Sequence, residues 1–168
     1  MTRGALAAAC LALVLTGGST ATFGQPSTGW RDFAGTWSLA GRRHTIPQAR
    51  GTAAIVDLSG AFIVTGGAAL GRGFRGEVIG FDDGEGVSVG RAVWTDERGD
   101  RVFSRLTGEG ISGGRRITGT ITGGTGQYAG LEGEFTFTWQ YVLAGEDDRI
   151  QGRAGDVTGR VRRAGPQP

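Results

Sequence analysis

The stretch GGTGQYAGLEGEFTFTWQY, residues 123–141, decides the fold class of this chain. Its first part, Gly123 to Gly133, is dense in glycine, the residue that tight turns favour. Its second part, Phe135 to Tyr141, alternates aromatic and polar residues with the period of a half-buried β-strand. The stretch therefore predicts a tight turn that leads directly into a strand.

A nucleotide-binding loop is the alternative interpretation of these glycines. Residues 124–129, GTGQYA, fit a dinucleotide fingerprint, but that fingerprint needs a helix directly behind the glycines to meet the pyrophosphate. Here Gly130, Gly133 and the aromatic strand follow instead. A Gly-Lys-Ser/Thr phosphate loop is excluded as well, because the chain has no lysine. We therefore assign the glycines to a structural turn.

Period-two segments separated by short glycine-rich loops recur along the 168 residues, without a long amphipathic helix. The expected strands are 36–40, 52–58, 61–65, 74–81, 87–97, 101–107, 116–122, 134–143 and 149–162. The break at Ser59-Gly60 is weak enough for a bulge in one longer strand, and the last strand has a possible bend near Gly155. This rhythm predicts an all-β fold, a single antiparallel up-and-down β-barrel of about eight strands, with a two-sheet sandwich as the alternative.

The first 24 residues predict a secretory signal peptide. Residues 4–16 form an apolar run that is well short of the roughly 20 residues needed to span a bilayer, so no integral membrane anchor is expected. Small residues allow cleavage after Ala21 or after Gly24, and we place it after Gly24. We expect an exported bacterial protein, periplasmic or secreted, divided into the signal peptide 1–24, an N-terminal segment 25–34, a barrel domain 35–163 and a tail 164–168.

Composition excludes several kinds of chemistry. Cys10 is the only cysteine and lies within the signal peptide, so the mature chain has no disulfide, thiol nucleophile or thiolate metal ligand. His44, in the expected loop 41–51, is the only histidine, and no cluster has the spacing of metal ligands. The formal net charge of +2 comes from arginines interleaved with acids, so no nucleic acid partner is expected. We expect no cofactor and no metal.

The run GGTGQYAGLEG, residues 123–133, resembles the Gly-Gly-Thr/Ser-Gly-x-aromatic turn of the allene oxide cyclase and dirigent barrels. The resemblance implies an eight-stranded barrel with an apolar cavity, in a superfamily that contains plant cyclases, dirigent proteins and bacterial barrels that fold polyketides into rings. Members of this superfamily often form dimers or trimers, so a homo-oligomer is possible. The plant cyclase uses asparagines and a cysteine, which the mature chain lacks, so its mechanism does not transfer.

Residues 32–37, DFAGTW, resemble the Gly-x-Trp motif at the start of lipocalins. This resemblance implies that Trp37 packs at the closed end of the barrel against an arginine of the last strand. Arg160 or Arg162 is the candidate for that guanidinium, by stacking.

The aromatic residues Phe135, Phe137, Trp139 and Tyr141 share one face of their strand, and we expect this face to point into the barrel. They either fill the interior or form the wall of a ligand cavity. Tyr141, at the end of the strand, is expected to bring its hydroxyl to the cavity mouth.

One hairpin is expected to place a charged pair in the same cavity. If the loop 82–86 closes symmetrically, the cross-strand pairs are Glu77 with Arg91, Ile79 with Val89, and Phe81 with Val87. Burial of such an ion pair costs desolvation, so Glu77 and Arg91 are candidate catalytic residues, together with Tyr141. A shifted register or an outward face would make the pair an ordinary surface ion pair. Asp57 is a further acid, on the face opposite Val56 and Leu58.

Three functions follow from this sequence. The first is an exported barrel that binds a small apolar or aromatic molecule, with Ile79, Phe81, Val89, Phe135, Phe137 and Trp139 as ligand-binding residues. The second is a cofactor-independent cyclase or isomerase that folds a polyene or an oxidised lipid, and whether the chain is an enzyme stays open. The third is a structural or interaction barrel with a filled core. A cavity of roughly 300 Å3 or more is what the first two would need.

Overall fold

The computed structural model describes residues 29–145 and 148–164. The predicted signal peptide lies outside the described residues, as does nearly all of the predicted C-terminal tail. Within the described part, no helix is long and apolar enough to cross a membrane.

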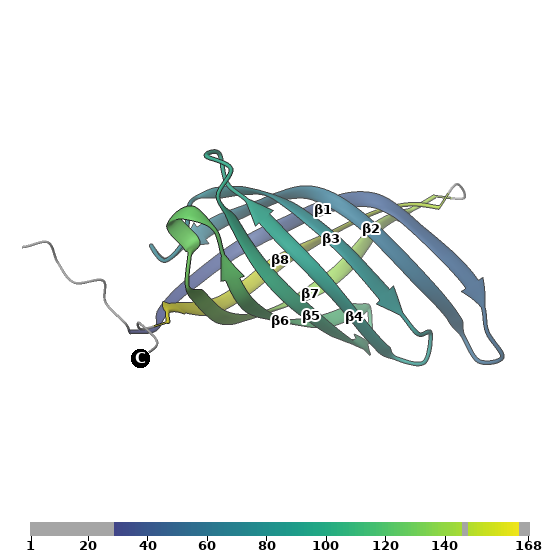
Figure 1. The fold of residues 1–168 in the computed structure, drawn as a ribbon. Coiled ribbons are helices and arrows are strands. Elements are labelled where there is room, and N and C mark those ends of the chain that lie inside the picture. Colours follow the sequence, from purple (N-terminus) through teal and green to yellow (C-terminus); the bar gives the residue numbers. More distant parts are fainter. Residues whose placement is uncertain (1–28, 146–147, 165–168) are drawn as a thin grey trace, which may run out of the picture.

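The described residues form eight strands and one short 3-10 turn. The strands are β1 (Arg31–Pro47), β2 (Thr52–Gly66), β3 (Gly73–Asp82), β4 (Val87–Thr95), β5 (Arg101–Ile111), β6 (Gly114–Gly124), β7 (Leu131–Ala144) and β8 (Arg149–Arg163), and the turn is η1 (Gly126–Tyr128). Each strand pairs antiparallel with the next in sequence, and β8 pairs with β1 to close the barrel (Figure 1). The prediction of an all-β, up-and-down barrel of eight strands is confirmed, and the sandwich alternative is excluded.

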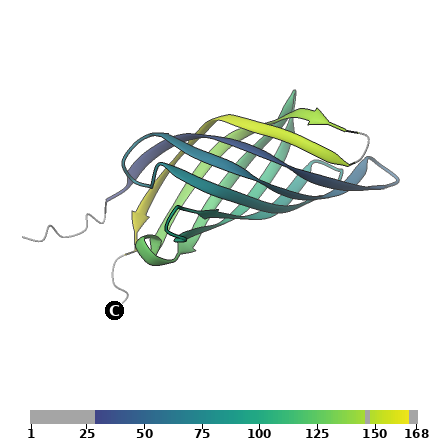
Figure 2. The same ribbon diagram turned by 90° about the horizontal axis from the view of Figure 1, so that it is seen from above.

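The strands run obliquely to the barrel axis (Figure 2), as closure of a sheet requires. One end of the barrel carries the start of β1, the end of β8 and the loops β2–β3, β4–β5 and β6–β7, and we call it the terminal end. The other end carries the four hairpins β1–β2, β3–β4, β5–β6 and β7–β8, and we call it the hairpin end. The two ends differ in how their interiors are filled.

Several strands are longer than the sequence predicts. The two strands expected on either side of Ser59-Gly60 are one strand, β2, whose pairing with β1 continues without a bulge at that point. The expected loop 41–51 is wrong over Gly41 to Pro47, which extends β1, and His44 lies exposed on its outer face opposite Ile55. Pairing across a closed sheet gives these residues backbone partners that the local sequence does not reveal.

The bend expected near Gly155 is a bulge in an otherwise continuous β8. Val157 pairs with Gly35 and Ala154 with Trp37, so Gly155 and Asp156 together lie opposite one residue of β1. The Asp156 carboxylate accepts a hydrogen bond from the backbone N–H of Thr138 on β7 at 3.0 Å. The side chain thereby replaces part of the hydrogen bonding that the bulge removes from the ladder.

Aromatic rings fill the terminal half of the interior. Trp94 is fully buried, and its ring centroid lies 4.5 Å from Phe62, 4.9 Å from Phe135 and 5.6 Å from Trp37. These separations are typical of packed aromatic pairs. Rings of this size fit because glycines face them: a Cβ on Gly119 would lie 2.1 Å from the ring of Phe135.

The glycine-dense run closes the terminal end. Gly126 and Gly130 have positive φ angles of 51° and 69°, which glycine adopts without steric cost. A three-residue 3-10 turn separates them, and β7 begins at Leu131. A strand, not a helix, therefore follows the glycines, so the predicted turn is confirmed and the dinucleotide site is excluded.

The side chain of Tyr128, in this turn, is buried at the terminal end of the barrel, and hydrogen bonds hold its hydroxyl in place. Tyr128 donates a hydrogen bond to Asp96 Oδ2 at 3.2 Å, and Gln127 Nε2 donates to the same oxygen at 2.6 Å. Burial raises the pKa of Tyr128, and the Asp96 carboxylate adds to that effect, so that it reaches about 12. Burial also raises the pKa of Asp96, but four hydrogen bonds to its carboxylate outweigh that effect and lower it below 3.8 overall.

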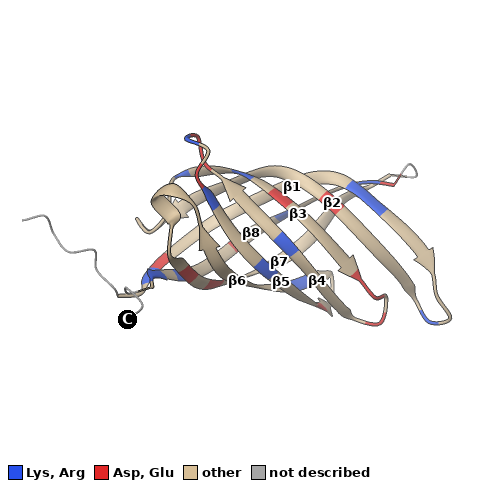
Figure 3. Cartoon of the chain, viewed as in Figure 1, with Lys and Arg blue, Asp and Glu red and all other residues tan. Residues whose placement is uncertain are grey.

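The lipocalin-like expectation for the arginines of β8 is wrong. Trp37 is fully buried, whereas Arg160 and Arg162 lie on the outer face of the barrel and bracket Trp30. Each guanidinium carbon is 4.6 Å from the Trp30 ring centroid. The same arginines form ion pairs with Glu134 and Glu132 of β7. The outer face carries both signs of charge along its length (Figure 3).

Trp94→Ala should lower the free energy of unfolding by about 3–5 kcal/mol, because it leaves a cavity among rings that do not collapse into it. Urea denaturation followed by circular dichroism measures this loss. Ile79→Ala is the matched control: Ile79 is 65% exposed on the outer face, so its loss should stay within about 0.5 kcal/mol. Similar losses for the two variants would contradict the filled interior.

Tyr128 should titrate with a pKa of about 12 in the folded protein. Tyr141→Phe leaves Tyr128 as the only tyrosine, so the ultraviolet absorbance of tyrosinate then reports it alone. A folded pKa raised above its ordinary value of 10.0 gives stability that is complete below pH 10 and lost as the pH rises toward 12. Tyr128→Phe should remove this alkaline loss, and a Tyr128 pKa near 10 would contradict the buried hydrogen bond.

Candidate ligand site

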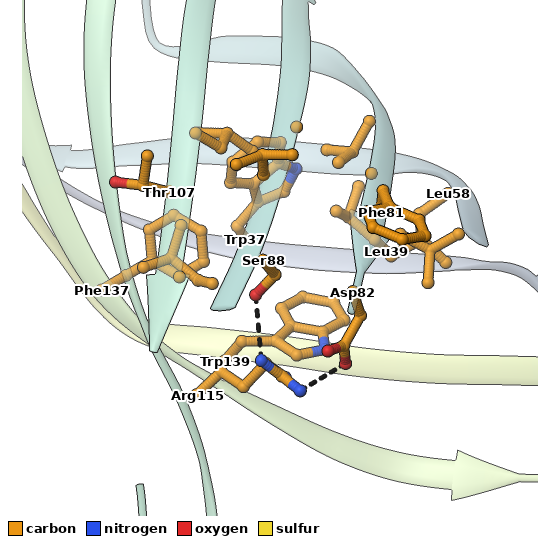
Figure 4. Close-up of a pocket in the computed structure, with 18 of the residues that line it drawn as sticks. Trp37, Leu39, Leu58, Phe81, Asp82, Ser88, Thr107, Arg115, Phe137 and Trp139 are labelled. Carbon is orange, nitrogen blue, oxygen red and sulfur yellow. Dashed lines mark hydrogen bonds and ion pairs between the residues drawn. The ribbon is translucent and has the colours of Figure 1, made fainter. Parts of the chain in front are cut away.

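The hairpin half of the interior contains a cavity of about 90 Å3. Apolar side chains form most of its wall (Figure 4). They include Trp37, Leu39, Leu58, Val78, Leu106 and Phe137. The interior is therefore divided, with rings filling the terminal half and a space left in the hairpin half. The cavity is smaller than the roughly 300 Å3 expected for a site that encloses a drug-sized molecule.

Glycines on β3, β4 and β5 leave this space. Gly80 and Gly90 pair directly with each other, Gly108 pairs with Ser88, and all of them border the cavity. No side chain projects from these glycines into the interior, in contrast to the rings of β1 and β7 that face them. The cavity is thus a consequence of residue size at particular inner-face positions.

Three polar residues at the cavity form a group that we call the inner polar cluster: Asp82, Ser88 and Arg115. Asp82 and Ser88 are paired across the β3–β4 hairpin, and Arg115 reaches them from the start of β6. Arg115 Nη1 donates to Ser88 Oγ at 3.0 Å, and Arg115 Nη2 forms an ion pair with Asp82 Oδ2. Figure 4 shows both interactions beside the ring of Trp139.

The ion pair of this cluster is largely removed from solvent. The side chains of Asp82 and Arg115 are 11% and 19% exposed, and the second oxygen of Asp82 accepts the backbone N–H of Gly84 at 3.0 Å. A buried ion pair costs desolvation and is often no more stabilising than apolar residues of similar size. Both charged groups thus have partners within the protein, and both line the cavity.

The predicted inward orientation of the aromatic strand is confirmed for Phe135, Phe137 and Trp139, which are all buried. Phe137 and Trp139 line the cavity, while Phe135 belongs to the filled half, against Trp94. Tyr141 borders the cavity, is 43% exposed and packs edge-on against Trp139 with the centroids 6.1 Å apart. The role of these residues in binding stays a prediction.

The predicted pairing of Glu77 with Arg91 is wrong. Glu77 pairs with Val93, and Arg91 pairs with Ile79 on one side and with Arg105 on the other. The turn is centred one residue later than expected, because the Asp83 carboxylate accepts the backbone N–H groups of Glu85 and Val87. This shift moves every partner along β4 by two residues.

The predicted face of this hairpin is wrong as well. The residues that point inward on β3 are Phe74, Gly76, Val78, Gly80 and Asp82, so the intervening set points outward. Glu77 forms its ion pair with Arg75 on the outer surface, and Arg91 is exposed. Ile79, Phe81 and Val89 are large side chains on the outer face, although Phe81 and Val89 also border the cavity. Asp57 is exposed, on the face opposite Leu58 as expected.

Sequence reasoning missed the inner polar cluster. Asp82 falls in the expected loop 82–86, and Arg115 lies just outside the expected strand 116–122. The available signal was the alternation of Arg115 with the apolar Ile117 and Ile121, which places the arginine on the inner face of its strand. Ser88 carries no such signal, because serine is common on either face.

Comparison of the chain with protein-family models, with curated proteins and with solved structures gives no match in any of the three. The similarity of its glycine turn to the allene oxide cyclase and dirigent barrels therefore stays an expectation from the sequence, and any function is argued from the geometry of the site.

Arg115→Met should lower the free energy of unfolding by about 1–3 kcal/mol, because it leaves the Asp82 carboxylate buried without its ion partner. Thermal and urea unfolding measure the loss, and Asp82→Asn in the same chain should restore part of it. Arg75→Met is the matched control: it breaks the outer ion pair with Glu77, where the cost should stay under about 1 kcal/mol. Equal costs at the two sites would contradict the burial of the inner polar cluster.

Proposed function

We propose that this protein is an exported barrel that binds a small apolar or aromatic molecule inside its hairpin half. The observation that carries the proposal is an apolar cavity that adjoins a group of hydrogen-bonding side chains, the inner polar cluster. Small-molecule sites commonly combine an apolar wall with a few well-placed polar groups. Export rests on the signal-like sequence of residues 1–24.

The size of the cavity limits what it can hold. A volume of about 90 Å3 falls short of the roughly 300 Å3 that a site enclosing its whole ligand would need, so only part of a ligand can be buried here. The buried part of the ligand is therefore a single ring or a short branched chain, and any further part projects from the hairpin end. Phe137 and Trp139 offer ring faces and edges to an aromatic group.

The alternatives have less support. A purely structural barrel explains the rings of the terminal half but gives no reason for the glycine-lined space or for the ion pair beside it. For a cyclase, two of the three expected acid–base residues, Glu77 and Arg91, lie on the outer face, and only Tyr141 borders the cavity. Binding is therefore the function that the geometry supports best.

The experiment uses variants that fill the cavity. Val56 lines it, and Val56→Phe should occupy the space that a ring would take. Titration calorimetry with toluene and benzyl alcohol should show binding to the wild-type barrel and an affinity at least about tenfold weaker for the variant, a difference of about 1.4 kcal/mol.

Ile55→Phe makes the same kind of change on the neighbouring, outward-facing position and should bind both probes like the wild type. Circular dichroism of each variant checks that the barrel is intact. Absence of binding to the wild type, or undiminished binding to a folded Val56→Phe barrel, would overturn the proposal. If the probes bind as expected, native mass spectrometry of protein isolated from its own host would identify a ligand that co-purifies.

A further inference from the structure

Arg43 is a second arginine on the inner face of the hairpin end. It pairs across strands with Val56, which lines the cavity, and directly paired residues of a sheet share a face. Its neighbours Arg42 and His44 are exposed on the other face. Its backbone N–H donates to the carbonyl of Asp148 at 2.8 Å, so this part of β1 is held to the neighbouring β7–β8 hairpin.

The guanidinium of Arg43 has an unused donor. Its Nε is buried and has no hydrogen-bond partner, and no ion pair of Arg43 is found among residues 29–145 and 148–164. A buried donor without a partner costs about 1–3 kcal/mol, and more for a charged group. Arg115, in contrast, has both Asp82 and Ser88 as partners. The unpartnered donor beside a cavity is what a ligand acceptor would satisfy.

Charge favours an anionic acceptor over a neutral one. Among the described residues, the charged side chains that the strand register places on the inner face at and next to the cavity are Arg43, Arg115 and Asp82, which sum to one positive charge; the side chain of Asp148, beside Arg43, is exposed. A neutral carbonyl or hydroxyl would satisfy the N–H of Arg43 but leave this charge unbalanced. A carboxylate supplies one negative charge and matches the planar guanidinium with two oxygens.

The neighbouring residues leave room for such a group. The cross-strand row from Arg43 continues through Val56 to Gly80 and Gly90. Adjacent strands are about 4.8 Å apart, so Gly80 lies about 10 Å from Arg43 along the row. The side chain of Arg43 is long enough to extend over part of that distance. The two glycines place no side chain in the remaining space.

We propose that the ligand is a small carboxylate with one ring or a short apolar chain, and that Arg43 binds its carboxylate while the apolar part lies in the cavity. This assignment rests on the proposed binding function. The inner polar cluster then forms a neutral wall beside the ligand, and the unpaired charge of Arg43 selects the head group.

The test uses benzoate, benzyl alcohol and toluene, which share a ring and differ in head group. Titration calorimetry on the mature chain should show benzoate binding at least about tenfold more tightly than benzyl alcohol, a difference of about 1.4 kcal/mol that decreases as salt rises. Arg43→Met should abolish this preference and leave binding of benzyl alcohol and toluene unchanged. Arg42→Met, on the exposed face of the same strand, is the matched control and should keep the preference.

A second measurement separates binding from folding. Arg43→Met removes an unpartnered buried donor, so the ligand-free variant should unfold at the same urea concentration as the wild type or a higher one. A marked loss of stability would assign Arg43 to the fold and overturn the inference. Loss of the preference in Arg115→Met, with its retention in Arg43→Met, would move the head group to the inner polar cluster.

The outcomes for the two proposals are distinct. Equal affinity of the wild type for all three probes would overturn the carboxylate assignment and leave the proposed binding function standing. No binding of any probe would overturn both.

Discussion

Closure of eight strands into one barrel limits the interior volume, and the other features of the structure depend on that limit. An eight-stranded barrel is just wide enough for side chains to fill it or for one small ligand. Large rings on β1, β2, β3, β4 and β7 occupy the terminal half, and Trp94 packs against five of them: Phe33, Trp37, Phe62, Phe74 and Phe135. Such packing is possible only because facing positions are glycine, as at Gly119 against Phe135.

The same pairing of large with small residues explains why the two ends differ. At the terminal end, Gly35, Gly76 and Gly119 face the rings of Phe62, Trp37 and Phe135, and the turn that carries the buried Tyr128 closes this end of the barrel. At the hairpin end, Gly80 and Gly90 face each other across β3 and β4, and the rings that line the space do not fill it. The charged groups of the interior, Arg115 with Asp82, and Arg43 beside Val56, lie at this end.

The sequence predicts the aromatic strand well and the neighbouring hairpin poorly, for a physical reason. On β7 the large residues Phe135, Phe137 and Trp139 face inward, so size and period together indicate the correct face. On β3 the large residues Ile79 and Phe81 face outward, and Val78, Gly80 and Asp82 take the inner positions that border the cavity. A preference for burying large apolar residues therefore gives the wrong face there, and it places Glu77 and Arg91 inside although both lie on the outer face.

The sequence by itself determined the all-β class, the approximate number of strands, the turn at 123–133 and the inward face of β7, because each depends on local periodicity or on the conformational freedom of glycine. Only the tertiary structure decided the face of β3 and β4, the register of their hairpin and the meeting of Arg115 with Asp82. These depend on closure of the barrel, which fixes the inner face of every strand, and on side-chain hydrogen bonds in a turn. Because a one-residue shift in a turn changes every partner on the next strand, such contacts follow from the closed barrel and not from any single segment.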